Sequence, residues 1–348
     1  MSQSSLRALV GRAVSRLSGA RPQPDTHARE LKAMRALLEQ ILHRVERLEK
    51  PGKAKDAAAD MRAQLDAVRQ RLDALVGHEK TARKVRSNTA RQVTSLVRAQ
   101  YLVAGLAAPA ALMGRRFRLH SQHEEDGIVL ALLEAAGVTG RRFLEIGSGS
   151  SGGNSGVLAF ELGWTGLMVE ARTEQALRLH QKLAHNPQVS VADVMVTPGN
   201  VNELIRSHGL SGEIDLLSLD IDSIDYWVFE AIEACNPRVV VLEYNALLGP
   251  DRAVTIPATG MPAGAPGVYA GASLAALDTL ARRKGYGLVL CEDTGINAFF
   301  LRDGLAPHIP RLTVAAAYRP RHTGADEARD PADVLREIER AGLALVDV

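Results

Sequence analysis

A glycine-rich stretch in the middle of the chain has the residue types of a binding loop. Residues 143–156 read FLEIGSGSSGGNSG, with five glycines in the last ten positions. Glycine is needed where the backbone takes positive φ or where a ligand approaches the main chain closely. A phosphate, a nucleoside or a plain tight turn would each account for such a run. The spacing of Gly147, Gly149 and Gly152 fits the G-x-G-x-x-G of dinucleotide-binding loops, although that spacing alone is a weak signal.

The carboxylate of Glu145, two residues before the first glycine, argues against a dinucleotide. It would repel a pyrophosphate bound at the loop. It could instead accept a hydrogen bond from a bound ammonium group, or it could hold the loop in shape. The NAD-dependent enzyme that the glycine spacing suggests is therefore disfavoured.

A second group of chemically active side chains follows two later apolar segments. Its members are Asp220, Asp222, Asp225, Glu243 and Asn245. The carboxyl ends of parallel strands meet at one edge of a sheet, where ligands bind, so these side chains are expected to converge. Carboxylates that share a small volume repel one another, and something must compensate their charge.

Two interpretations of this acidic group stay open. The first is a divalent cation, with Mg²⁺ as the best match, held by Asp220 or Asp222 together with Glu243 and Asn245. The cation would lower the pKa of a substrate hydroxyl and orient it. The second is a metal-free site in which Asp220 is the general base and Asp225 is the N-cap of the next helix. In both, Asp220 and Asp222 are the predicted catalytic residues.

The elements that must position these residues alternate between strands and helices after Arg118. Strands are predicted at 142–146, 166–171, 189–194, 214–221 and 238–244. This alternation predicts a parallel sheet covered on both faces by helices. Residues 286–292 and 297–303 are separated by only four residues, so they must form an antiparallel hairpin. The predicted fold class is therefore α/β and Rossmann-like, with five parallel strands and a terminal antiparallel hairpin.

The loop, the acid inside the strand and the terminal hairpin together resemble the class I S-adenosylmethionine-dependent methyltransferases. The resemblance covers about residues 121–303. FLEIGSGSSG is similar to the family's first motif, h-h-E/D-h-G-x-G-x-G, with Ser151 where the third glycine often stands. VEAR is similar to the second motif, in which Glu170, 25 residues after Glu145, would accept both ribose hydroxyls.

This resemblance implies a set of residues that bind S-adenosylmethionine: Gln122, Glu145, Gly147, Gly149, Asn154, Glu170 and Asp193. Asp193 would meet the adenine amine. Asn154 would reach the methionine carboxylate or else cap the helix after the loop. His120 and His123 would lie over the methionine end, either as bases or as ordinary surface histidines.

More narrowly, SQHEEDGIV (121–129) and LLSLDIDSIDYWVFEAI (216–232) resemble the FkbM methyltransferases, which modify sugar hydroxyls in polyketides and surface polysaccharides. Ser218 and Asp222 replace the lysine and the glutamate of that family's h-K-h-D-h-E-G motif, so the chain would be a divergent relative. The resemblance implies an O-methyltransferase that acts on a hydroxyl of a saccharide or small-molecule acceptor. The glycine- and proline-rich residues 246–272 would roof that acceptor, with contacts from Tyr244, Arg252 and Tyr269.

The N-terminal part of the chain has a different pattern. In residues 1–27, apolar residues at helical spacing are mixed with arginines, which leaves open a helix on an anionic membrane surface, a tail or one more packing helix. Residues 28–110 contain two runs at heptad spacing, on either side of Pro51-Gly52. They predict a coiled coil that joins copies of the chain, with a helical pair docked on its own domain as the alternative. Residues 111–312 would be the methyltransferase domain and 313–348 a C-terminal extension.

Composition narrows the function classes further. The 348 residues carry a net charge of +2, and so small a charge indicates no particular class of binding partner. Residues 80–118 hold nine Lys or Arg and no acid, but few aromatic residues are interleaved, so nucleic acid is disfavoured. Cys235 and Cys291 lie in apolar surroundings and are expected to be buried thiols of a reducing compartment, which predicts a cytoplasmic protein. Peripheral contact with the inner face of the membrane stays open.

A function from another class also stays open. The chain could be a catalytically inactive protein with the methyltransferase fold. It would then serve as a scaffold that assembles a glycan-synthesis complex through its coiled coil.

Overall fold

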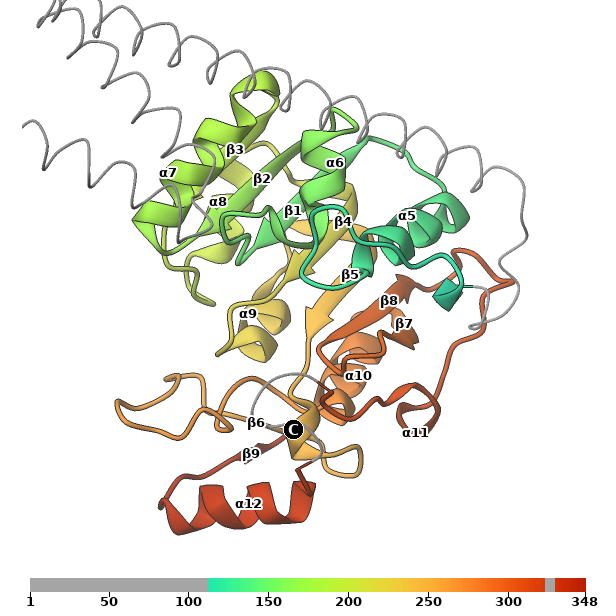
Figure 1. The fold of residues 1–348 in the computed structure, drawn as a ribbon. Coiled ribbons are helices and arrows are strands. Elements are labelled where there is room, and N and C mark those ends of the chain that lie inside the picture. The colour runs from blue at the N-terminus through green and yellow to red at the C-terminus, as the bar shows by residue number, and fades with distance from the viewer. Residues whose placement is uncertain (1–111, 323–328) are drawn as a thin grey trace, which may run out of the picture. The chain divides into compact units, whose positions relative to one another are not determined.

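The computed structural model of the chain describes residues 112–322 and 329–348, whose arrangement is shown in Figure 1. The predicted N-terminal tail, the predicted coiled coil and most of the basic run at 80–118 lie outside the described residues. No helix within the described ranges combines the length and the apolar character needed to cross a bilayer.

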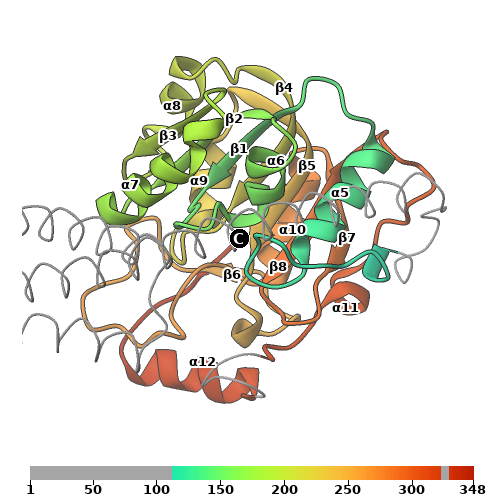
Figure 2. The same cartoon turned by 45° about the horizontal axis from the view of Figure 1, so that its top comes forward.

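Seven strands form the central sheet in the order β3-β2-β1-β4-β5-β8-β7 (Figure 1, Figure 2). Their bounds are β1 (Arg142–Ile146), β2 (Thr165–Glu170), β3 (Val189–Asp193), β4 (Gly212–Leu219), β5 (Cys235–Glu243), β7 (Tyr286–Cys291) and β8 (Asn297–Arg302). Strands β1 to β5 run parallel, whereas β8 is antiparallel to both of its neighbours, β5 and β7. This strand order and these directions are those of the class I methyltransferase fold, so the predicted fold class is confirmed for this part of the chain.

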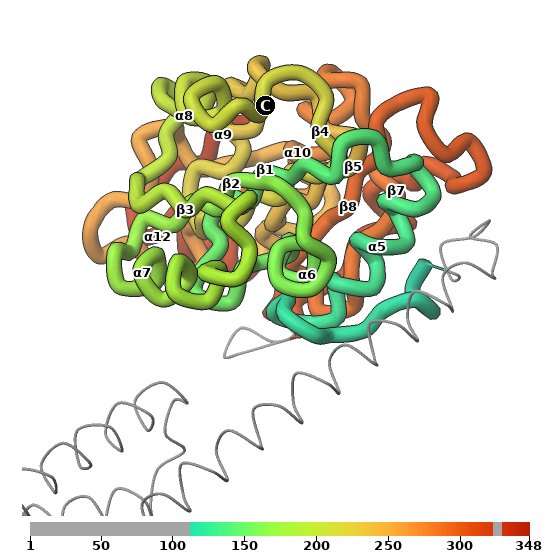
Figure 3. Tube along the Cα trace, turned by 90° about the horizontal axis from the view of Figure 1, so that it is seen from above, coloured from blue at the N-terminus to red at the C-terminus, as the bar shows by residue number. Residues whose placement is uncertain are grey.

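Helices cover both faces of the sheet, as Figure 3 shows from above. One face carries α5 (Glu125–Ala136), α6 (Gly156–Phe160) and α7 (Thr173–Lys182), and the other carries α8 (Val201–Ser207), α9 (Asp225–Ala231) and α10 (Leu274–Arg283). Side chains alternate between the two faces along each strand, so Phe143 packs on the first face and Leu144 on the second. Because both faces are covered, the strands read as continuous apolar runs, and β4 ends in six consecutive buried residues.

The turn after β4 differs from the prediction. The strand ends at Leu219, two residues earlier than expected, and the chain then turns through Asp222, whose φ of 55° is incompatible with an extended strand. Helix α9 begins at Asp225 itself, and Ile224 is the N-cap, so the predicted capping role of Asp225 is wrong. The Asp225 carboxylate instead accepts hydrogen bonds from the backbone N–H groups of Ile221 and Ser223, at 2.8 and 2.9 Å. It thereby fixes the turn that presents Asp222.

Residues 246–272, which were predicted to be an aperiodic roof, pack around a small core of their own. They contain η3 (Ala246–Leu248) and β6 (Val254–Thr255), which pairs antiparallel with β9 (Val346–Asp347). Leu248 and Val254 pack against Val334 and Ile338 of α12 (Pro331–Arg340). A short helix, α11 (Val314–Ala317), precedes this C-terminal part. The C-terminal residues therefore brace the segment that follows β5.

The small core makes a testable contribution to stability. Ile338 is 2% exposed, and its replacement by alanine should lower the free energy of unfolding by about 2–5 kcal/mol, because the surrounding side chains cannot fill the space. Trp227 donates a hydrogen bond from its indole nitrogen to the carbonyl of Ile256, so tryptophan fluorescence during urea unfolding reports on this region. Glu339→Ala, on the exposed side of α12, is the control. Equal losses in the two variants would contradict a buried brace.

Candidate functional site

A cavity of about 620 Å³, called here the large cavity, opens at the carboxyl ends of β1, β2, β4 and β5. Its volume lies within the range of about 300–1,000 Å³ that is typical of small-molecule sites. Nine of the residues predicted from the sequence line it, namely Gln122, Glu145, Gly147, Gly149, Asn154, Glu170, Asp220, Asp222 and Glu243. Asp193 and Asn245 do not.

The glycine turn after β1 lies against the turn after β4. Gly147 has φ 88°, and a Cβ atom on it would stand 1.6 Å from the carbonyl oxygen of Asp220. The backbone N–H groups of Gly147 and Ser148 both donate to the carbonyl of Val169 at the end of β2, at 2.9 and 3.1 Å. The absence of a side chain at Gly147 is thus what lets three strand ends meet.

Gly147→Ala should therefore be far more damaging than an ordinary substitution of a glycine with positive φ. Gly163 provides the matched control, because it has φ 65° and a Cβ atom on it would meet nothing within 4 Å. We expect Gly163→Ala to cost about 1–2 kcal/mol for the left-handed backbone alone. Gly147→Ala should cost more than about 3 kcal/mol, because the added atom meets backbone that cannot move aside. Urea unfolding of both variants measures the difference, and similar costs would show that the two turns are not in contact.

Glu145 holds the glycine loop from inside the protein. Its side chain is 1% exposed, and its two oxygens accept hydrogen bonds from the backbone N–H groups of Asn154 and Ser155, at 3.1 and 2.9 Å. The hydroxyls of Ser155 and Ser218 donate to it as well, at 2.5 and 3.0 Å. Of the two roles that the sequence left open for Glu145, the structure shows the one of holding the loop.

Ser218 of β4 links Glu145 to Asn154. Its hydroxyl donates to Glu145 and accepts a hydrogen bond from the side-chain amide of Asn154 at 3.2 Å. The amide of Asn154 is thus bonded to β4, and it does not cap a helix, since Gly152 and Ser155 hold the cap positions here.

Burial raises the pKa of Glu145 to about 8, from an ordinary value of 4.5, although the hydrogen bonds from Ser155, Ser218 and Asn154 act in the opposite direction. Between these two pH values the folded protein carries a proton on Glu145 that the unfolded chain has lost. Stability therefore falls as the pH rises through this window, by up to about 1.4 kcal/mol per pH unit.

Glu145→Gln should remove this dependence, because glutamine keeps the shape and carries no titrating group. The free energy of unfolding of the variant relative to the native protein should rise steadily from pH 5 to pH 8. Urea unfolding at four pH values measures the difference between the two proteins. A constant difference, or one that falls with pH, would show that Glu145 is ionised throughout.

Glu170 lies at the end of β2, where the second motif requires an acid. Its side chain is 5% exposed and lines the large cavity. One oxygen accepts the backbone N–H of Gly149 at 2.8 Å, and the other accepts the backbone N–H of Arg172 at 2.9 Å. Glu170 therefore joins the glycine loop to the start of α7. Its Oε1 also accepts the Nε–H of the exposed Arg172 side chain at 3.2 Å, so only Oε2 keeps a lone pair for a ligand.

The predicted contact of Asp193 with adenine is not supported by the structure. Asp193 ends β3 with an exposed side chain outside the large cavity, and the next residues, Val194, Met195 and Val196, line it. Successive side chains on a strand point to opposite faces, so an error of one position in a strand end exchanges one side chain for its neighbour. The wall at this end of the cavity is apolar.

The segment before α5 also lies at the cavity. Gln122 lines it with an exposed side chain, as the resemblance implies. His120 lines it too, but its Nε2 lies 3.0 Å from a carboxylate oxygen of Glu161 and its ring packs on Phe160. The carboxylate of Asp126 accepts the backbone N–H groups of residues 119–121 and so fixes this segment over the cavity.

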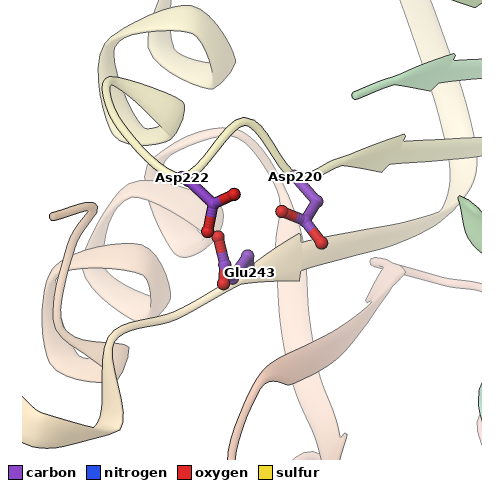
Figure 4. A group of neighbouring side chains, drawn as sticks. All are labelled: Asp220, Asp222 and Glu243. Atoms are coloured by element: carbon purple, nitrogen blue, oxygen red, sulfur yellow. The ribbon is translucent and has the colours of Figure 1, made fainter. Parts of the chain in front are cut away.

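The three acids at the ends of β4 and β5 converge, as the sequence predicted. Oxygens of Asp220, Asp222 and Glu243 lie within 4.8 Å of one another, and Figure 4 shows the three carboxylates facing a common space. Burial raises the pKa of Asp220 to about 7, with the charge of Asp225 as the next cause. Burial followed by the charges of Asp220 and Asp222 holds the pKa of Glu243 well above its ordinary value. The charges that shift these two pKa values are those of neighbouring acids.

Asn245 does not belong to this acidic group, which corrects its prediction as a metal ligand. Its side-chain oxygen accepts the backbone N–H of Leu247 and caps η3, and its amide donates to the carbonyls of Val268 and Ala270, both at 2.9 Å. The residue therefore shapes the segment after β5. Helix capping by asparagine competes with ligand binding, and the sequence alone does not distinguish the two.

Tyr244, Arg252 and Tyr269 were predicted as sugar contacts, and the polar group of each side chain has a partner within the protein. The hydroxyl of Tyr244 donates to the carbonyl of Arg319, and that of Tyr269 donates to the carbonyl of Ala344, both at 2.7 Å. Arg252 forms an ion pair with Asp347 on the surface. All three instead tie the region after β5 to the C-terminal part of the chain.

Two residues of the site were not foreseen. Asn297 of β8 is the cross-strand partner of Glu243, and its amide donates to Glu125 at 3.0 Å. Its side-chain oxygen is buried and has no hydrogen-bond partner among the described residues. Arg321, from the segment after α11, lines the large cavity beside the acids. The antiparallel pairing of β8 with β5 was predictable in principle, whereas nothing in the sequence around Arg321 marks it.

No protein-family model matches the chain, and no curated protein does. Solved structures that are similar to it include the N-terminal domain of EvdMO1 with SAH bound (16% identity, 52% of this chain and 80% of that chain, TM-score 0.35). Others are ribosomal protein L11 methylase from Lactobacillus delbrueckii subsp. bulgaricus (15%, 52% and 80%, 0.32) and an S-adenosylmethionine-dependent methyltransferase from Clostridium acetobutylicum (11%, 52% and 91%, 0.33). At these scores the likeness adds nothing to what the strand order shows.

Proposed function

We propose that the chain is an S-adenosylmethionine-dependent methyltransferase that acts on a hydroxyl oxygen. The observation that carries the proposal is a single cavity into which the glycine turn, the acid at the end of β2 and the acids at the ends of β4 and β5 all project. A cosubstrate with a positive sulfonium suits a cavity lined by the carboxyl groups of Glu170, Asp220, Asp222 and Glu243.

In this proposal each wall of the cavity binds one part of the cosubstrate. Glu170 accepts the ribose hydroxyls, one at Oε2 and the other at Oε1 in place of the exposed side chain of Arg172. The apolar residues 194–196 lie against the adenine ring. The glycine turn allows the nucleoside to approach the backbone, and residues 120–122 cover the methionine end.

Methyl transfer then needs an acceptor for one proton. The hydroxyl oxygen forms the new bond to the methyl carbon as the bond from that carbon to sulfur breaks, and the hydroxyl proton passes to a carboxylate. Asp220 and Asp222 are the proposed catalytic acceptors, because they stand with Glu243 at the edge of the cavity next to the glycine turn. Most of the rate acceleration would come from holding the two reactants in line.

The acidic group also fits a divalent cation. Oxygens within 4.8 Å of one another can share an ion at the usual ligand distances of about 2.0–2.6 Å. The unpartnered oxygen of Asn297, next to Glu243, is a further neutral ligand in place of Asn245. When bound, the cation would lower the pKa of the acceptor hydroxyl.

A saccharide is the acceptor class that we propose. It follows from the FkbM-like segments before α5 and at the end of β4, and a polar, acid-lined wall suits a ligand rich in hydroxyls. Residues 28–110 would join copies of the enzyme through the predicted coiled coil. The scaffold hypothesis makes the opposite prediction for the cavity, since it requires no cosubstrate binding.

Isothermal titration with S-adenosylhomocysteine separates these functions. The full chain should bind the ligand, and Glu170→Gln should weaken binding by about 10- to 100-fold, because a charged acceptor of the ribose hydroxyls becomes neutral. Glu174→Ala, an exposed residue of α7 that pairs with Arg178, is the control and should leave binding unchanged. Absence of binding by the native chain at millimolar ligand would support the scaffold and refute the enzyme.

A further inference from the structure

A second, smaller space opens beside the acidic group. This side pocket has a volume of about 80 Å³ and shares Asp222, Glu243 and Arg321 with the large cavity. Its other walls come from residues 244–247 and 267–271, which belong to the region after β5. A water molecule occupies roughly 30 Å³ of liquid, so the side pocket has room for one small polar group of a larger ligand.

The side pocket is separate from the part of the cavity that the cosubstrate would fill. No described residue of the glycine turn, of the end of β2 or of the 194–196 wall lines it. A ligand group in the side pocket would therefore belong to the acceptor. The proposed proton acceptor Asp222 stands between the two spaces together with Glu243, because both residues line the large cavity and the side pocket.

Arg321 brings positive charge to this boundary. Arg118 and Arg172 also line the large cavity, but of the cations lining either space in the described part of the chain only Arg321 lines the side pocket. The backbone around it is fixed, since the N–H of Arg319 donates to the hydroxyl of Tyr244 at 3.2 Å and the N–H of His322 donates to the carbonyl of Thr294 at 3.0 Å.

The guanidinium of Arg321 has no partner in residues 112–322 and 329–348. Among the described residues, no carboxylate lies within 4.0 Å of it and no hydrogen bond joins it to another group. Arg319, two residues earlier, is occupied, since it donates to three backbone carbonyls. A half-buried guanidinium with five free donors is suited to a planar or tetrahedral anion, which it can bind through two parallel hydrogen bonds.

We infer that the acceptor carries an anionic group, a carboxylate or a phosphate, which Arg321 binds in the side pocket while the reacting hydroxyl lies at Asp222 and Glu243. This inference rests on the proposed function. A wall rich in carboxylates repels an anion unless a cation lies beside the anion. Arg321 supplies that cation, because it forms no ion pair with the described acids. The acceptor would thus be a uronic acid or a phosphorylated sugar rather than a neutral one.

Paired sugars test the inference on the full chain, with and without S-adenosylhomocysteine. Titration calorimetry compares D-glucuronate with D-glucose, D-galacturonate with D-galactose, and glucose 1-phosphate with glucose. At least one anionic sugar should bind 10-fold or more tightly than its neutral partner. The uronates and the phosphate form separate arms, so the arm that binds identifies the anion.

Variants identify the cation. Arg321→Gln should remove the preference for the anionic sugar, by about 10- to 100-fold in affinity, and Arg321→Lys should restore only part of it, because an ammonium lacks the two-pronged geometry. Arg252→Gln, which removes an arginine of the surface pair with Asp347, is the control and should change nothing.

The result that overturns the inference is an equal response to charged and neutral sugars, including no response to any of them, while S-adenosylhomocysteine still binds. A preference that survives in Arg321→Gln would overturn it too. Failure of S-adenosylhomocysteine to bind would instead refute the proposed function, and the sugar titrations without it would still report on Arg321.

Discussion

The contact between the backbone of Gly147 and the carbonyl of Asp220 is the constraint on which the candidate site depends. Strands β1 and β4 are neighbours in the sheet, so the turns that follow them lie side by side. The absence of a side chain at Gly147 lets these two turns touch. Under the proposed function, one turn would hold the nucleoside and the other carries Asp222, so the same contact would fix the distance between cosubstrate and proton acceptor. Glu145 stabilises this contact because it accepts hydrogen bonds both from the loop, at Asn154 and Ser155, and from β4, at Ser218.

The carboxyl groups of the large cavity differ in how their charge is compensated. Five carboxyl groups line one cavity, and burial moves the pKa of Glu145, Asp220 and Glu243 upward. Glu145 is compensated by four hydrogen bonds from within the protein. Within residues 112–322 and 329–348, the group at Asp220, Asp222 and Glu243 has no such set of donors apart from a hydrogen bond between Asp220 and Glu243, so its charge would be compensated by a cation, by protons or by the ligand. This difference separates an acid that holds a loop from acids that are available for chemistry.

Much of the fold was predictable because the strands are buried on both faces and therefore appear as uninterrupted apolar runs. The hairpin of β7 and β8 followed from its short connection, and the convergence of Asp220, Asp222 and Glu243 followed from parallel strand ends. The errors at Asp193 and Asn245 have local causes, an uncertain strand end and a helix cap. Asn297 and Arg321 were missed because distant parts of the chain bring them to the site, and periodicity carries no such information. The N-terminal tail and the coiled coil remain predictions.

The region after β5 has a core that is distinct from the two that flank the sheet. Leu248, Val254 and Ile256 pack with Val334 and Ile338, largely apart from the side chains under the glycine turn. Substitutions in this region would change the packing of this core and would leave the glycine turn and residues 194–196 of the large cavity unchanged. Over evolutionary time these separate cores would let acceptor preference diverge among descendants of one ancestor. A change in acceptor specificity would not lower the affinity for the proposed methyl donor.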